Sequence, residues 1–259
     1  PRILDQFDLL IGDSQYNLQS LAPYLTRPVP ALPVYPVIDP PKLKALPYDT
    51  SLLEHLRSTR QVNILFVSRI ARNKRQDRLM QVLDYYYREI DTQVHLWLVG
   101  NENSDPAYRA ELEELRLSLA SRDHIHFTGK ISDAQIYAYY RAADVLLSAC
   151  EHEGFGVPLV EAMAFDVPVI AYAATAVPET MGEAGILIKD WDVPITPSLI
   201  YEMVHNHIRK EQLLTEQHRN LIRFSPKEAQ LRLEAVVRFL RSGTLHPSVK
   251  EISPTQSGR

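Results

Sequence analysis

The chain has 259 residues with 28 Lys and Arg against 32 Asp and Glu, which gives a net charge of −4 at pH 7. Its content of 45% hydrophobic and 23% charged residues is typical of a globular protein and excludes a disordered or collagen-like chain. The acidic balance argues against a nucleic-acid-binding protein. The single cysteine, Cys150, cannot form an internal disulfide, and no apolar run reaches the roughly 20 residues that cross a bilayer. We therefore expect a cytoplasmic location.

The first part of the chain predicts one strand and one helix, followed by a connector. An apolar run over residues 7–12 indicates the strand, and Ser14 is placed to cap a helix over 16–25. Eight of the 18 prolines then fall within residues 23–47. Because proline removes a backbone donor and fixes φ, we expect an extended, stiff connector without an interior helix, and a domain boundary near 39–47.

Beyond the connector, short apolar runs alternate with helical patterns. Apolar strands that are buried on both faces and separated by helices predict an α/β fold with a doubly wound, parallel, Rossmann-like sheet. We expect this unit to extend over residues 46–204. Its expected strands are 63–67, 95–99, 125–128, 145–148, 167–171 and 186–188, and its expected helices are 76–90, 106–119, 133–143 and 158–164.

The last third of the chain predicts helices over residues 197–204, 207–220 and 225–241. We treat 205–241 as a separate helical segment. Residues 205–242 carry eight Lys and Arg against four Asp and Glu, and this excess fits either a solvated helix face or a surface in peripheral contact with a membrane. Residues 242–259 contain Gly, Ser, Thr and Pro without periodicity, which predicts a disordered tail.

The loop after the first strand of the parallel sheet carries two cations at a useful spacing. Ligands of open α/β sheets bind beyond the carboxyl ends of the strands, so polar residues at these ends are the first candidates. Arg69 lies at the strand end and Lys74 at the entry to the next helix. Together they could bind one diphosphate, with the arginine supplying a planar fork and the lysine a point charge. The spacing alone is also compatible with a basic loop in solvent.

A second candidate segment follows the strand at 145–148 and leads into a helix. Gly154 and Gly156 allow a ligand to approach the backbone, and Pro158 suits the first helical turn, whose amides favour an anion. Glu153 precedes this helix and Glu161 lies within it. Carboxylates accept hydrogen bonds from hydroxyl groups, which suggests sugar recognition. A capped helix with two surface glutamates would give the same pattern.

Both segments match motifs of a known family. The two glutamates are separated by seven residues, in a segment that reads Glu153-Gly154-Phe155-Gly156-Val157-Pro158-Leu159-Val160-Glu161. This segment resembles the signature of the retaining nucleotide-sugar glycosyltransferases of family 4, which have the two-domain GT-B architecture. That family usually reads Gly-Arg-Leu, three variable residues and Lys-Gly in the first loop. Here Arg69 and Lys74 keep the register, while Ser68 and Arg75 replace the two glycines.

The resemblance covers roughly residues 60–190 and implies a role for each matching position. Arg69 and Lys74 would hold the donor diphosphate, with Ser68 in the same loop, Glu153 would contact the donor sugar, and Glu161 would bind the ribose hydroxyls. The backbone beside Lys130 and Ile131 would bind the nucleobase. The backbone amides near the sugar and the diphosphate would come from Gly154, Phe155, Gly156, Val157, Pro158 and Leu159.

The resemblance also implies a function and a missing part. We expect a transferase that moves a hexose from a nucleotide diphosphate sugar to a hydroxyl group with retention of configuration. The expected donor is by preference a UDP-sugar such as UDP-glucose. The expected acceptor is a carbohydrate or lipid-linked molecule, as in polysaccharide biosynthesis. Residues 1–45 would be the remnant and linker of an N-terminal acceptor domain that is supplied in cis or in trans. The alternative is a non-catalytic nucleotide-sugar binding module or split subunit. Asp190 and Asp192 have a metal-binding spacing, but the cationic pair makes a metal redundant, so we expect no cofactor.

Overall fold

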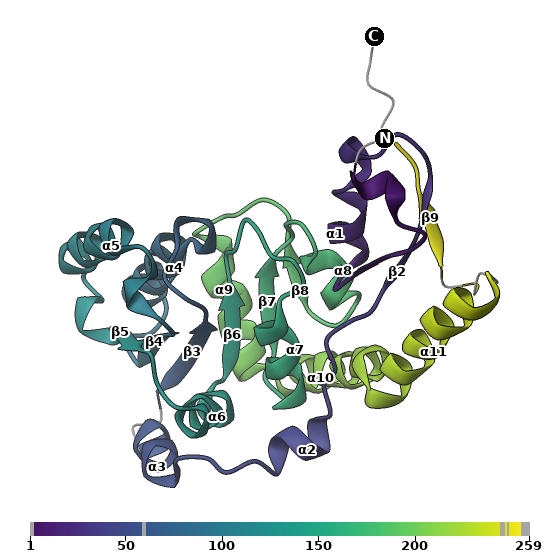
Figure 1. The fold of residues 1–259 in the computed structure, drawn as a ribbon. Coiled ribbons are helices and arrows are strands. Elements are labelled where there is room, and N and C mark those ends of the chain that lie inside the picture. The colour runs from purple at the N-terminus through teal and green to yellow at the C-terminus, as the bar shows by residue number, and fades with distance from the viewer. Residues whose placement is uncertain (1–2, 59–60, 244–246, 248, 255–259) are drawn as a thin grey trace.

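The computed structural model describes residues 3–58, 61–243, 247 and 249–254, and within these ranges nine strands form two sheets (Figure 1). The larger sheet has six strands in the order β5-β4-β3-β6-β7-β8, and all of its pairs are parallel. This confirms the predicted doubly wound α/β fold. The strands are β3 Val62–Val67, β4 Val94–Val99, β5 Ile125–Gly129, β6 Val145–Ser148, β7 Val169–Tyr172 and β8 Ile186–Ile188.

Helices cover both faces of the six-stranded sheet, which explains why its strands are apolar throughout. Along β3, Ile64 and Phe66 pack into one core while Leu65, between them, packs into the other. The first core includes α4 Gln76–Glu89, α5 Pro106–Ser118 and α9 Ile195–His205. The second includes α3 Thr50–Ser58, α6 Asp133–Ala142, α7 Val157–Ala164, α8 Val177–Met181 and the end of α10 His207–Leu221.

The strand order places the two candidate loops side by side. The chain first builds β3, β4 and β5 outward in one direction and then returns to β6 on the other side of β3. Such a reversal opens a crevice at the carboxyl ends of the two central strands, where ligands of this fold class bind. The loop after β3 and the loop after β6 both leave from this crevice. The sequence-derived candidates therefore lie at the topological switch point of the sheet.

The N-terminal part departs from the predicted connector. A second sheet joins β1 Leu10–Gly12 and β2 Val29–Pro33, and a short helix, α2, runs over Pro40–Lys44. The prediction of no helix here is wrong because prolines are tolerated in the first turn, where their missing donor costs nothing, and Asp39 caps the helix by accepting from the Lys42 amide. The helix predicted over 16–25 is also too long. It ends as α1 Gln15–Gln19, since Pro23 has no N–H to continue it, and a 3-10 turn follows.

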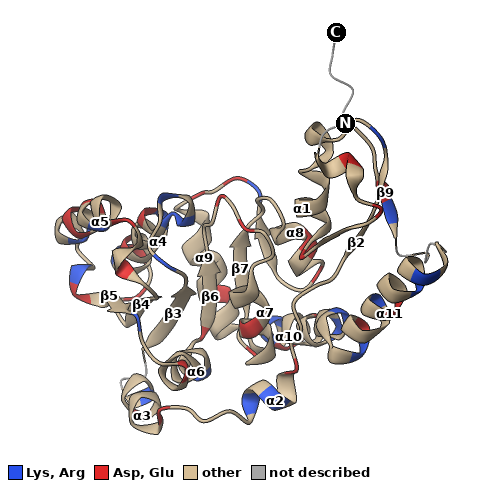
Figure 2. Ribbon diagram, viewed as in Figure 1, with Lys and Arg blue, Asp and Glu red and all other residues tan. Residues whose placement is uncertain are grey.

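The C-terminal segment is integrated with both sheets rather than separate. Helix α10 packs on α7, whereas α11 Pro226–Ser242 extends to the small sheet (Figure 1). There, the Arg232 side chain donates to the Pro33 carbonyl at 2.8 Å. Lys and Arg residues recur along α11 (Figure 2). The tail is ordered where it forms β9 Lys250–Ile252, antiparallel to β2, so the prediction of disorder over 242–259 is wrong for these residues. Burial of the Ile252 side chain explains this order, while residues 244–246, 248 and 255–259 lie outside the described part.

None of the helices in the described ranges combines the length and hydrophobicity that a membrane-spanning helix requires.

Candidate functional site

Hydrogen bonds to neighbouring elements hold the backbone of the loop between β3 and α4. The Ser68 amide donates to the Val99 carbonyl at 2.9 Å, and the Gln76 side chain donates to the Arg69 carbonyl at 3.0 Å. A 3-10 turn over Arg72–Lys74 leads to Arg75, which adopts a left-handed conformation with φ of 52° and is the N-cap residue of α4. This fixed backbone leaves the Arg69 side chain exposed at the surface.

The loop between β6 and α7 is shaped by Gly156 and held by a threonine. Gly156 has a φ of 90° and stands at the N-terminus of α7, and a Cβ built there would lie 2.9 Å from Leu159 Cδ1. Only glycine suits such a position without strain. The Thr175 hydroxyl receives a hydrogen bond from the Glu153 amide and donates to its carbonyl, both at 2.8 Å. The backbone at Glu153 is therefore fixed by a side chain to which the sequence analysis assigned no role.

The two loops meet through their predicted site residues. Lys74 Nζ lies 2.5 Å from Glu153 Oε1, and the same ammonium group is 3.4 Å from the His152 carbonyl. Both side chains are mostly shielded, with 12% of Lys74 and 17% of Glu153 exposed. Loss of solvent strengthens such a pair relative to a surface ion pair. The structure thus brings a cation of the first loop and a carboxylate of the second loop together, while their roles toward a donor stay predictions.

The other two predicted charges, Arg69 and Glu161, have different contacts from this pair. Among the described residues, no ion pair joins Arg69 or Glu161 to Lys74 or Glu153. Glu161 lies on α7 and accepts a hydrogen bond from the Tyr140 hydroxyl at 2.8 Å. Burial raises the pKa of Glu161, and the tyrosine hydrogen bond offsets only part of that rise. Tyr140 itself is fully buried in α6, and nothing in the sequence indicated this contact.

The predicted base-binding loop follows β5, at the edge of the sheet. Lys130 is exposed, and Ile131 packs partly against the core shared by α6 and α7. Their contact with a nucleobase stays a prediction. The same holds for the amides of α7, of which the Leu159 amide already donates to the Gly156 carbonyl at 3.0 Å and Pro158 has none. In the described part of the chain, no cluster of three or more His, Cys, Asp and Glu side chains is arranged to hold a metal ion.

The start of α1 forms a further rim of the site that the sequence analysis did not identify. A Cβ built at Gly154 would lie 2.8 Å from the Asn17 side chain, so α1 comes directly against the candidate loop. The Glu179 carboxylate joins the two units, because it accepts from the amides of Gln15 at 2.7 Å and Tyr16 at 2.9 Å. These amides lie in the first turn of α1, where a negative charge is favoured. The small N-terminal sheet and α1 are thereby attached beside the crevice.

Comparison with known proteins agrees with this architecture. Residues 52–212 match the model of the family described as Glycosyl transferases group 1. Mannosylfructose-phosphate synthase from Agrobacterium fabrum is 33% identical over 111 residues, which cover 41% of this chain and 24% of that protein. The GDP-mannose-dependent alpha-(1-6)-phosphatidylinositol monomannoside mannosyltransferase from Mycobacterium tuberculosis is 27% identical over 162 residues, which cover 59% of this chain and 41% of the mannosyltransferase. The chain thus spans less than half of the length of these two relatives.

Solved structures share the fold over most of the chain. Sucrose-phosphate synthase from Thermosynechococcus elongatus superposes with a TM-score of 0.74 at 22% identity, covering 93% of this chain and 60% of that one. Anabaena HepE, solved in complex with UDP and glucose, superposes with a TM-score of 0.73 at 21% identity, covering 92% of this chain and 64% of that one. Because the family match extends over more than half of the residues, this chain belongs to the glycosyl transferases group 1 family, with a fold of the GT-B type.

Proposed function

We propose that this chain is the donor-binding half of a retaining hexosyltransferase whose donor is a nucleotide diphosphate sugar. The observation that carries the proposal is the Lys74–Glu153 pair, which joins the loops after β3 and β6 at the switch point of the sheet. A cation suited to a phosphate and a carboxylate suited to sugar hydroxyls stand here in direct contact. UDP is the favoured nucleotide, and the complex of HepE with UDP and glucose supports this choice by its similar fold.

Donor binding would change the partners of these two groups. The diphosphate would replace Glu153 as the partner of Lys74, and Arg69, which is exposed beside the crevice, would provide a second cation. Glu153 would then be free to accept hydrogen bonds from the donor sugar, while Glu161 would bind the ribose. As the sugar leaves the diphosphate, negative charge builds on the phosphate oxygens, and the two cations would stabilise it electrostatically. The proposal needs no metal, because these cations balance the charge.

The acceptor would arrive from a partner domain. The relatives from Agrobacterium and Mycobacterium are at least twice the length that this chain matches, so a domain supplied in cis or in trans would complete the enzyme. We expect a carbohydrate or lipid-linked hydroxyl group as acceptor. The alternative is a nucleotide-sugar binding module that turns over donor only when the partner domain is present.

Calorimetric titration with UDP, GDP and ADP tests the donor site. We expect one of the three, by preference UDP, to bind with a one-to-one stoichiometry. Lys74→Ala should weaken this binding at least tenfold, because about 1.4 kcal/mol corresponds to a factor of ten and a charge-assisted hydrogen bond contributes at least this much. Lys227→Ala, on the exposed face of α11, is the matched control and should bind as the unaltered chain does. Failure of all three nucleotides to bind would refute the proposal.

A further inference from the structure

Arg75 occupies a backbone conformation that its side chain does not favour. Its φ of 52° lies in the left-handed region, where a Cβ is unfavourable and glycine is preferred. Arg75 immediately follows Lys74 and directly precedes α4, and a glycine would suit this turn better. A strained residue persists where the surrounding structure holds it, and strain of this kind concentrates at functional sites. The side-chain contacts of Arg75 are therefore the reason to expect for an arginine, instead of a glycine, at this position.

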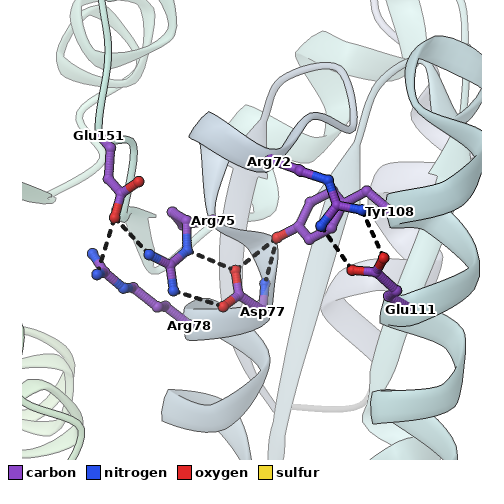
Figure 3. Close-up of polar contacts among 7 residues, drawn as sticks. All are labelled: Arg72, Arg75, Asp77, Arg78, Tyr108, Glu111 and Glu151. Carbon is purple, nitrogen blue, oxygen red and sulfur yellow. Dashed lines mark hydrogen bonds and ion pairs between the residues drawn. The ribbon is translucent and has the colours of Figure 1, made fainter.

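The Arg75 guanidinium is the centre of a network that reaches both loops (Figure 3). It donates to both carboxylate oxygens of Asp77, at 3.0 and 2.9 Å, and its remaining Nη1 lies 2.5 Å from Glu151 Oε1. Asp77 is held in turn by the Tyr108 hydroxyl at 2.7 Å, and Arg78 is 3.0 Å from the same Glu151 oxygen. Burial alone would raise the pKa of Asp77, but the hydrogen bonds from Arg75 and Tyr108 lower it overall. The ion pair between Arg75 and Asp77 thus stays charged on both sides.

Besides the contacts of Arg78 with Glu151 and of Lys74 with the His152 carbonyl, three links join the two loops through residues 73, 74 and 75. The Glu151 amide donates to the Asn73 carbonyl at 2.9 Å, Arg75 pairs with Glu151, and Lys74 pairs with Glu153. In the proposed function, the third of these links must open, because a donor phosphate takes the place of Glu153 on Lys74. The other two do not involve donor-binding groups. They can keep the loops in register while the lysine changes partner.

We propose that Arg75 is a positioning residue, whose fork on Asp77 and Glu151 keeps the Lys74 loop joined to the Glu153 loop when donor phosphate replaces Glu153 on Lys74. The inference rests on the proposed function. A planar guanidinium is required for it, since one group must bind a carboxylate through two nitrogens and still reach a second carboxylate. A lysine supplies one point charge and cannot do both.

Variants at Arg75 test this by comparing UDP with uridine, which has the same base and ribose but no phosphate. Arg75→Gly removes the fork and leaves the turn unstrained, and Arg75→Lys keeps the charge without the fork. We expect UDP to bind at least tenfold more weakly to both variants, and uridine, followed by NMR titration, to bind with unchanged affinity. Arg72→Gln is the matched control, because Arg72 lies in the same turn and pairs with Glu111 instead of the second loop. It should bind both ligands normally.

A second measurement does not depend on the ligand. Amide hydrogen exchange at Glu151 should quicken in Arg75→Gly and stay unchanged in Arg72→Gln, because only the first loses a link beside the Glu151–Asn73 hydrogen bond. Binding of UDP by Arg75→Gly with unchanged affinity, an equal loss for uridine and UDP, or unchanged exchange at Glu151 would each overturn the inference. If the unaltered chain binds no nucleoside diphosphate, the proposed function fails, and the exchange measurement alone then decides whether Arg75 holds the loops together.

Discussion

Removal of the Tyr140 hydroxyl should destabilise the protein in a pH-dependent manner. In Tyr140→Phe, Glu161 loses the hydrogen bond that this hydroxyl donates at 2.8 Å. A hydrogen bond to a charged group contributes about 1.5–3 kcal/mol, and a buried carboxylate that loses its partner keeps its desolvation cost. We therefore expect the free energy of unfolding at pH 7.5 to fall by about 1.5–3 kcal/mol. The aromatic ring, which stacks on Phe165 at 5.3 Å between centroids, is retained.

The pH dependence of this loss follows from the pKa of Glu161. Its folded-state pKa is already raised by burial, and loss of the Tyr140 hydrogen bond should raise it further. A raised carboxyl pKa means that the folded state loses stability as pH rises through that pKa, because the ionised form is the unfavourable one. The penalty of Tyr140→Phe should thus be complete at pH 7.5 and smaller at pH 4, where the neutral acid predominates.

Urea denaturation at the two pH values, with a second tyrosine as control, measures the effect. Tyr86 is also fully buried, but its hydroxyl has no hydrogen-bond partner among the described residues. Tyr86→Phe should therefore leave the free energy of unfolding unchanged or raise it slightly, since it removes an unsatisfied polar group. Equal effects of the two substitutions, or a Tyr140→Phe penalty that is the same at pH 7.5 and pH 4, would show that the Tyr140–Glu161 contact does not act as described.

Three further predictions concern the loop, the junction of the units and a histidine pair. Gly156→Ala should lower the free energy of unfolding by about 1–2 kcal/mol because residue 156 has a positive φ, whereas Gly154→Ala should lower it less. Equal losses for the two variants in chemical denaturation would contradict this. Glu179→Gln should speed amide exchange in the first turn of α1, which loses a charged acceptor, and unchanged exchange there would argue against the junction. Burial and neighbouring histidines lower the pKa of His95 and His126 to about 4. Because the unfolded chain binds protons near pH 6.5 and the folded chain does not, the free energy of unfolding should fall as pH decreases from about 6.5 towards 4. An NMR titration in which either imidazole titrates near pH 6.5 would refute this.

The six-stranded sheet could be read from the sequence because its signal is local. Strands buried on both faces are continuous apolar runs, as along β3, and the helices between them carry their own caps, such as Ser132 with Gln135 before α6. The candidate loops could also be located, since polar residues at the ends of such strands follow directly from the pattern. The Lys74 and Glu153 positions were predicted on this basis together with the family resemblance.

The pairing of distant groups could not be read in this way. Lys74 and Glu153 meet because β6 returns beside β3, and the order of strands in a sheet depends on long-range packing rather than on local hydrophobicity. The same reason hid the Tyr140–Glu161 hydrogen bond and the Arg75 network, whose members come from separate elements. Strand β9 is a third example, because a short segment becomes a strand only where β2 offers an unpaired edge. The sequence alone thus determined the strands of the six-stranded sheet and the positions of the two candidate loops, because these signals are local, whereas the tertiary structure decided which charged groups face one another.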